Sequence, residues 1–319
     1  MNQPHLSSSP APSLTPPPID AAMHTLIQLA VREDLGTGDQ TAQLAIPADL
    51  QGTGRIIARR DGVIAGTFLL ETILREYHPG MMCRILAPDA TRVTPDQPVA
   101  EITGPARAIL SAERVLLNFL GHLSGIATLT RRYVDALAPL PAERRPAICD
   151  TRKTTPGFRT LDKYAVRCGG GVNHRLGLYD GVMLKDNHLA ALRHKLGRDM
   201  TLAQLTREVR RQLDPAITLW LEVDTLEQLR EELAAPPTGP GGADIILLDN
   251  FAPDQMRQAV ELRNLQSKIK NQKSTILLEA SGGITLDNLA ACAATGVDRI
   301  SIGALTHSAP ALDLSMELA

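Results

Sequence analysis

Charged side chains are concentrated in one stretch of this chain, from Asp150 to His188. The stretch carries seven Lys or Arg residues against four Asp, whereas the formal net charge of the whole chain is −2. Three consecutive glycines at 169–171 interrupt it, and apolar residues are interspersed among the charges, which is not typical of a disordered basic tail. This composition predicts a folded pocket for small, highly anionic molecules.

Polar residues also follow the apolar segments in the second half of the chain. In a βα barrel the carboxyl ends of the strands meet on one face, where active sites lie. A single polar residue at a strand end can equally be the cap of the next helix, so the prediction rests on the whole set. The set comprises Asp150 with Arg152 and Lys153, Lys185 with Asp186, Glu222 with Asp224, Asp249 with Asn250, and Glu279 with Ser281.

Two glycine-containing segments suit a phosphate group. Ser281, Gly282 and Gly283 stand between an apolar segment and a helical pattern, where backbone N–H groups and the helix dipole favour an anion. Gly303 follows the last apolar segment. Phosphate sites after the last two strands recur in βα barrels, so the two segments together predict a phosphate site.

Glu222 and Asp249 are predicted to end neighbouring strands. Beside a polyphosphate these carboxylates could hold Mg²⁺, a hard cation that takes oxygen ligands. Without phosphate nearby they could act as general acid and base. The chain has no GxGxxG or Walker loop and no evident Ser-His-Asp grouping. From the residues alone, the interpretation stops at an enzyme that handles an anionic, phosphate-bearing substrate with Mg²⁺.

The elements that would position these residues alternate between short apolar strands and amphipathic helices. This alternation predicts a parallel sheet covered by helices. Gly-Ala-Asp and Gly-Val-Asp precede two of the strands, a weak repeat that favours a barrel over an open sheet. A Pro/Gly segment at 235–242 is interpreted as an interior loop. The predicted strands cover residues 147–152, 179–186, 217–224, 243–249, 275–281 and 298–304.

The first half of the chain predicts a mixed α+β unit. Asp20 is expected to cap a helix over 21–35, and residues 41–103 look rich in strands. Asp61-Gly62 predicts a hairpin turn between two of them. A long helix is expected to begin with Ser111 as its N-cap. Arg114 would then oppose the helix dipole in the first turn, although a solvated Arg explains it as well.

Composition excludes several other classes of protein. Apolar residues make up 44% and aromatic residues 3%, which suits an α/β core of Leu, Ile, Val and Ala. The near-neutral charge argues against a general nucleic-acid binder. The four cysteines show no CxxC spacing and predict reduced thiols, with Cys168 a small filler rather than a nucleophile. No apolar run approaches the roughly 18 residues that span a bilayer, and no secretory signal is evident, so a cytoplasmic location is expected.

Nine sequence segments together closely resemble the quinolinate phosphoribosyltransferase family, also called nicotinate-nucleotide pyrophosphorylase (carboxylating). Their order and spacing make the resemblance specific, and it covers nearly everything after the Pro-rich start of the chain. The segments are REDLGTGDQT, ERVLLN, TRKTTPGFR, GGGVNHR, KDNH, EVDTLEQL, LLDN, EASGGI and ISIGALTHS.

The resemblance implies an α/β fold in which an N-terminal α+β sandwich domain is followed by an incomplete parallel α/β barrel. We expect a disordered Pro/Ser-rich tail over 1–18, the sandwich domain over 19–117 and the catalytic barrel over 118–307. Residues 308–319 are expected to pack with the sandwich domain. The resemblance also implies a homodimer, or a hexamer, whose active sites are shared between subunits.

The implied reaction joins quinolinate to phosphoribosyl pyrophosphate (PRPP) with loss of CO₂, giving nicotinate mononucleotide and pyrophosphate for NAD synthesis, with Mg²⁺ as cofactor. Lys153, Lys185, Glu222 and Asp249 are the expected catalytic residues, the two carboxylates also being the metal candidates. The family's motifs place quinolinate beside Arg152, His174, Arg175 and Lys185, with Arg114 supplied across the dimer interface. They place the 5′-phosphate at Ser281, Gly282, Gly283, Gly303 and His307.

Three alternatives remain at this point. A homologous phosphoribosyltransferase could act on another acceptor, such as nicotinate. An aldolase-like barrel could use Lys185 as a Schiff-base amine. A paralogue could bind ligand without turnover. The full set of charged positions argues against the third alternative.

Overall fold

The computed structural model describes residues 14–196, 200–234, 242–269 and 276–318. Within these limits the chain forms two compact units. The first contains residues up to 131 together with 155–170 and residues from 309 onward, and the second contains 132–154 and 171–308. The predicted boundary at residue 117 falls inside a continuous helix. The domain limits drawn from the sequence stay a prediction, because contacts within a chain do not show which part folds by itself.

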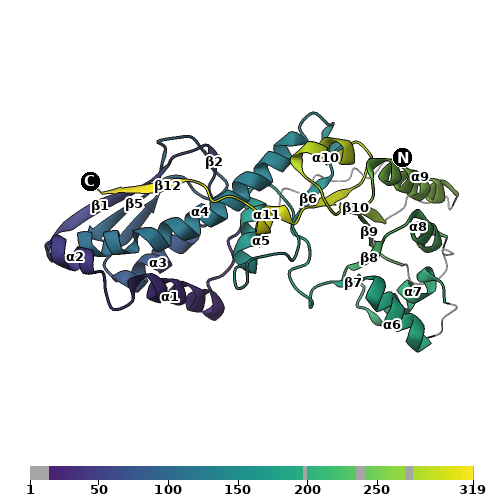
Figure 1. Ribbon diagram of the computed structural model, residues 1–319, viewed down its shortest axis with the longest axis horizontal. Helices are drawn as coiled ribbons and strands as arrows, with labels where there is room; N and C mark the ends of the chain where they lie inside the picture. Colours follow the sequence, from purple (N-terminus) through teal and green to yellow (C-terminus); the bar gives the residue numbers. More distant parts are fainter. Residues whose placement is uncertain (1–13, 197–199, 235–241, 270–275, 319) are drawn as a thin grey trace, which may run out of the picture. The chain divides into compact units, whose positions relative to one another are not determined.

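The first unit contains a four-stranded antiparallel sheet in the order β12-β1-β5-β3. Its strands are β1 (Gln51–Ala58), β3 (Met82–Ile85), β5 (Pro98–Pro105) and β12 (Leu314–Leu318). β12, from the end of the chain, pairs with β1 over its whole length (Figure 1). Two short strands, β2 (Gly62–Val63) and β4 (Arg92–Val93), form a separate ladder.

Helices bury the apolar side chains of this unit. Asp20 accepts a hydrogen bond from the backbone N–H of Met23 at 2.9 Å, which confirms the predicted cap of α1. The core draws on both helices and sheet: no surface is exposed on Ile27 of α1, Ile56 of β1 or Leu116 of α4. The helices are α1 (Ala21–Leu35), α2 (Gln40–Ala45), η1 (Thr67–Leu69), α3 (Leu70–Tyr77), α4 (Ala106–Ala136) and α5 (Arg159–Cys168).

Two local predictions for this unit are wrong. Asp61-Gly62 does not join a hairpin, because β2 pairs with β4 rather than with β1. Ser111 is not an N-cap, because α4 begins at Ala106 and the Ser111 hydroxyl donates to the carbonyl of Arg107 at 2.9 Å. Arg114 therefore lies beyond the first turn, and the argument from the helix dipole does not apply to it.

The second unit contains a six-stranded parallel sheet in the order β6-β11-β10-β9-β8-β7. All six predicted strands are present, and the predicted α/β class is confirmed. β6 and β7 are the edges and do not pair with each other in the described chain, so the barrel is incomplete. The strands are β6 (Ala147–Cys149), β7 (Val182–Leu184), β8 (Leu219–Val223), β9 (Ile245–Asp249), β10 (Leu277–Ser281) and β11 (Arg299–Ser301).

Helices cover this sheet in chain order from α6 to α10, each packed against the next (Figure 1). Thr201, Thr225 and Thr285 form capping boxes at the starts of α7, α8 and α10, which fix where these helices begin. The helices are η2 (Ala142–Arg144), α6 (Asp186–Leu196), α7 (Leu202–Gln212), α8 (Leu226–Leu233), α9 (Pro253–Ile269), α10 (Leu286–Ala293) and α11 (Ala304–His307).

Some predictions fall outside the described residues. Residues 1–13 of the predicted Pro/Ser-rich tail are not among the described residues, and neither are residues 235–241 of the predicted interior loop. Thr15 is described, and its carbonyl accepts a hydrogen bond from Arg167 at 3.0 Å. Among the described helices, none is long and apolar enough to cross a membrane. The cytoplasmic location stays a prediction.

Candidate active site

A cavity of about 750 Å³ opens at the carboxyl ends of the strands of the second unit. Every site residue implied by the family resemblance lines it except Arg114, which lies on α4 in the first unit with its side chain 62% exposed. Of the wider strand-end set, Asp150, Asp186, Asp224 and Glu279 do not line it. The predicted residues that line the cavity are Arg152, Lys153, His174, Arg175, Lys185, Glu222, Asp249, Ser281, Gly282, Gly283, Gly303 and His307.

Two guanidinium groups face the same part of the cavity. Burial lowers the pKa of Arg175, and the positive charge of Arg152 lowers it further, while Asp180 opposes the shift. Arg175 also donates to the carbonyl of Gly181 at 3.0 Å. The Nε atom of Arg152 is buried with no hydrogen-bond partner in the described chain. Two like charges held together in a half-buried cavity repel each other, and a bound anion with two negative charges would relieve this.

Lys185 and Glu222 form an ion pair at the β7–β8 end of the cavity. Glu222 is in β8, and Lys185 directly follows β7, which pairs with β8 in parallel. The backbone N–H of Lys185 donates to the ring of His188 at 3.1 Å, which holds the start of α6. In this structure Lys185 and Glu222 therefore neutralise each other. The family resemblance instead gave them separate roles, with Lys185 at quinolinate and Glu222 at the metal.

Asp249 ends β9 opposite Ser281 of β10. Glu222 is paired in register with Leu247, two residues before Asp249, so both carboxylates lie on one face of the sheet. The amide of Asn250 donates to Asp249 at 2.9 Å, and Asn250 has a left-handed backbone with φ of 55°. The sequence noted Asn250 only at a strand end and gave it no role, although it lines the cavity and its amide donates to the Asp249 carboxylate.

The glycines bring backbone close to side chains at two points. A Cβ atom added to Gly282 would lie 2.1 Å from Oδ1 of Asn250, so only glycine fits there. A Cβ atom at Gly303 would lie 3.1 Å from both His307 Nε2 and Lys153 Cδ. Lys153 and His307 therefore both lie close to the backbone of Gly303. A cationic side chain and a glycine backbone at one point suit the binding of an anion.

The cavity floor contains a histidine that is nearly buried. The His174 ring stacks on Trp220 with centroids 4.5 Å apart and planes at 25°. Its backbone N–H donates to the Asp150 carboxylate at 2.9 Å, and Asp150 is fully buried. Glu279, also fully buried, lies 3.4 Å from His174 Nε2. The sequence analysis placed Glu279 only at a strand end. Because side chains two residues apart in a strand point to the same face, its spacing from Ser281 could have indicated that it faces the cavity side of the sheet.

The described residues offer no cluster of three His, Cys, Asp or Glu side chains that could hold a metal ion. The Glu222 carboxylate is paired with Lys185, and Asp249 accepts from Asn250. This donor set does not suit a metal cage made by the protein alone. It suits Mg²⁺ that keeps waters and is bound mainly through substrate phosphates, with one or two carboxylates contributing.

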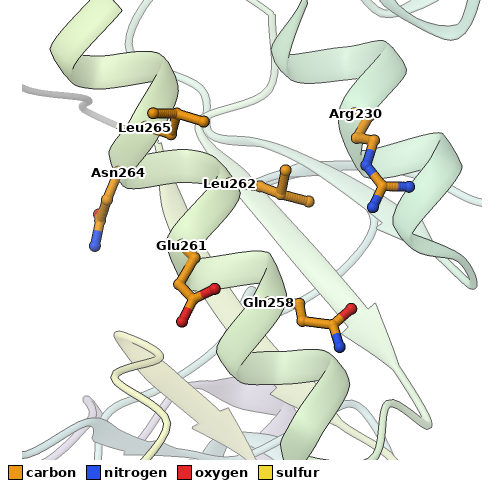
Figure 2. A pocket seen from close by; sticks show the side chains of 6 residues that line it. All are labelled: Arg230, Gln258, Glu261, Leu262, Asn264 and Leu265. Atoms are coloured by element: carbon orange, nitrogen blue, oxygen red, sulfur yellow. The ribbon is translucent and has the colours of Figure 1, made fainter.

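Other cations of the charged stretch lie elsewhere. Arg159, Lys163 and Arg167 belong to α5 in the first unit and do not line this cavity. A second depression, of about 520 Å³, lies between α8 and α9, where Leu262 points into the space facing Arg230 (Figure 2). None of the predicted site residues lines it. The remaining lining residues are Gln258, Glu261, Asn264 and Leu265.

Comparison with known proteins decides which family has this site. Residues 39–124 match the model of the quinolinate phosphoribosyl transferase N-terminal domain, and residues 126–317 match that of the C-terminal domain. The chain belongs to the quinolinate phosphoribosyltransferase family. It is therefore an enzyme of the nicotinate-nucleotide pyrophosphorylase (carboxylating) type, which transfers a phosphoribosyl group to quinolinate and forms nicotinate mononucleotide in NAD biosynthesis.

Two bacterial relatives match this chain over nearly their whole length. The nicotinate-nucleotide pyrophosphorylase (carboxylating) of Mycobacterium leprae is 43% identical over 302 residues, 94% of this chain and 98% of that protein. A probable enzyme of the same name from Bacillus subtilis is 41% identical over 286 residues, 90% of each protein. The structure of the Francisella tularensis nicotinate-nucleotide pyrophosphorylase gives a TM-score of 0.82 at 35% identity, covering 96% of this chain and 99% of that one.

Proposed function

We propose that the cavity holds quinolinate between Arg152 and Arg175, with PRPP beside it. The observation that carries this is that two guanidinium groups line one half-buried cavity, where burial and the positive charge of Arg152 lower the pKa of Arg175. Quinolinate has two carboxylates, and a planar guanidinium can grip each of them bidentately. Neutralising the dianion then allows it to lie beside a second anionic substrate.

The phosphate end of PRPP is proposed to lie along Ser281, Gly282 and Gly283, which precede α10. The glycines allow backbone N–H groups to approach an anion, and the start of the helix favours negative charge. Gly303 and His307 would complete the 5′-phosphate site. Lys153, which converges on Gly303, is proposed to approach the pyrophosphate.

Mg²⁺ is proposed to accompany PRPP, with Glu222 and Asp249 as its protein contacts, directly or through water. When bound, the ion supplies charge neutralisation to the departing pyrophosphate. These two carboxylates lie on one face of neighbouring strands. They are therefore also suited to stabilise the positive charge that develops at C1′ of the ribose as the pyrophosphate leaves.

The pyridine nitrogen is proposed to attack C1′ in a displacement that is largely dissociative. Once the ring nitrogen bears the ribose it is cationic, so it stabilises the electron pair that stays on C2 when the C2 carboxylate departs as CO₂. A proton from solvent then adds at C2 to give nicotinate mononucleotide. No covalent enzyme intermediate is required. Lys185 is paired with Glu222 as an ammonium group, which favours an electrostatic role over a Schiff base.

A homodimer with shared sites is proposed from the family resemblance. Arg114 is exposed, and its nearest acidic partner, Glu113, is 3.9 Å away in the same chain. Such a side chain is available to a second subunit. In this proposal Arg114 of one subunit adds a further cation to the quinolinate site of the other.

A crystal structure with bound quinolinate tests the proposed site. We expect the two carboxylates to contact Arg152 and Arg175, and we expect the Arg152→Ala variant to bind quinolinate far more weakly while keeping its fold. Quinolinate bound away from both guanidinium groups would contradict the proposal. So would an unchanged dissociation constant in the variant.

A further inference from the structure

A buried polar chain runs beneath the cavity, starting at Glu279 on β10. One carboxylate oxygen of Glu279 accepts a hydrogen bond from Nε of Arg299 at 2.8 Å, and the other accepts one from the hydroxyl of Ser301. Arg299 and Glu279 are paired in register on neighbouring strands. Sheet geometry therefore brings these groups together, and Glu279 has no exposed surface.

The same Glu279 oxygen that contacts Ser301 also faces His174, 3.4 Å from its Nε2 atom. On the opposite side of the ring, Nδ1 accepts a hydrogen bond from the backbone N–H of Arg175 at 2.7 Å. A backbone N–H can only donate, so Nδ1 carries no proton. In the neutral ring the proton is then on Nε2, the side that faces Glu279.

A second buried carboxylate holds the same segment from its other side. Asp150 accepts from the backbone N–H of His174 at 2.9 Å and from the side-chain amide of Asn173 at 2.5 Å. The His174 ring is also stacked on Trp220. The backbone that carries Arg175 is therefore fixed through His174 by contacts from β8, from β10 and from Asp150, which directly follows β6.

We propose that Glu279 is a positioning residue for quinolinate recognition, which sets the tautomer and orientation of His174 and thereby the backbone of Arg175. This rests on the proposed role of Arg175 in binding a quinolinate carboxylate. Glu279 does not touch the substrate in this proposal. It acts through His174, whose two ring nitrogens are directed at Glu279 and at the backbone of Arg175.

Stability alone does not account for a charged pair at this place. A buried ion pair is often no more stabilising than apolar side chains of the same volume. Burial favours the neutral form of Arg299, but the facing groups Cys149, Glu279 and Asp150 outweigh this and raise the pKa of Arg299. The guanidinium thus stays charged and lies against Glu279, the carboxylate that faces His174 Nε2.

The test is the Glu279→Gln variant, assayed for the KM of each substrate. Gln replaces a charged acceptor by a neutral amide that can also present N–H groups to His174. We expect KM for quinolinate to rise by roughly 10- to 100-fold, with KM for PRPP close to wild type. The matched control is Glu232→Gln on α8, since Glu232 is also a buried carboxylate but accepts from the backbone of Ala243, which does not line the cavity. It should leave both KM values unchanged.

A second measurement does not depend on how well the variant folds. Nitrogen NMR of the histidine rings in the unliganded wild-type protein should show His174 protonated at Nε2 and not at Nδ1. A proton on Nδ1 would overturn the proposal, as would a Glu279→Gln variant that raises both KM values alike or neither. A wild-type protein that releases no CO₂ from quinolinate would instead contradict the function itself, and the positioning role with it.

Discussion

The Lys185 ammonium group is paired with the Glu222 carboxylate across the ends of β7 and β8. The resemblance assigns Lys185 to the quinolinate site and Glu222 to the ribose and metal. In the free enzyme each residue therefore neutralises the other. We expect that an anionic substrate bound to Lys185 breaks this pair. The Glu222 carboxylate could then face the positive charge that develops at C1′ of the ribose.

Replacing Lys185 tests its part in this pair. Lys185→Ala should lower kcat/KM for quinolinate by roughly 10- to 100-fold, because a hydrogen bond to a charged group contributes about 1.5–3 kcal/mol. Lys195→Ala is the matched control, an exposed lysine on α6, the helix that begins directly after Lys185. Steady-state kinetics check both variants. Equal efficiencies in the two would remove Lys185 from the site.

Gly282→Ala should impair PRPP binding and lower the free energy of unfolding. Gly282 has φ of 95°, and an added Cβ atom would collide with Asn250, so we expect a loss of about 1–3 kcal/mol. KM for PRPP should rise in parallel. Gly296→Ala is the control, since Gly296 has φ of 88° but its added Cβ atom would meet only Val260, at 3.5 Å, outside the cavity. Gly296→Ala should lower the free energy of unfolding without changing the KM for PRPP. A raised KM for PRPP in both variants would mean that the effect of Gly282→Ala is only structural.

The cysteines should react slowly with alkylating agents in the native protein. Burial raises the pKa of Cys83 to about 11 and that of Cys168 to about 12, and it also raises the pKa of Cys292. A raised thiol pKa keeps the protonated, unreactive form at pH 8, and reactivity grows only as the pH approaches the pKa. Mass spectrometry after iodoacetamide treatment at pH 8 checks this. Rapid labelling of Cys168 with loss of activity would contradict its interpretation as a filler.

Mixing two impaired variants tests whether Arg114 acts across subunits. Arg114→Ala and Lys185→Ala subunits, combined in equal amounts and allowed to exchange, should recover about one quarter of wild-type activity. Half of the dimers are then mixed, and each mixed dimer has one intact site of two. Mass measurements must confirm that mixed dimers are present. Confirmed mixed dimers without activity would exclude a shared site.

The second unit could be predicted well because each of its strands and helices is encoded locally. Continuous apolar runs such as Ile245–Asp249 define buried parallel strands, and polar residues at their ends mark the cavity rim. The first unit was harder, because its sheet depends on long-range pairing. β2 follows β1 closely but pairs with β4, and no local signal distinguishes that partner from a hairpin.

The first residue of α4 and the contacts of Glu279 beneath the cavity could not be inferred from the sequence, because both depend on interactions that the local pattern does not show. Ser111 looks like a cap, but its hydroxyl donates to Arg107 one turn earlier, an interaction that serine also makes inside helices. Glu279 lies within an apolar run. Its function depends on Arg299 from the next strand and His174 from a loop, and neither contact is visible in the order of the residues.

The most direct measurement is turnover with PRPP, Mg²⁺ and either quinolinate labelled in its C2 carboxyl group or nicotinate. A site with two guanidinium groups for two carboxylates should prefer quinolinate and release one labelled CO₂ for each nicotinate mononucleotide formed. Preference for nicotinate, with nicotinate mononucleotide formed and no CO₂ released, would contradict the function assigned to this cavity.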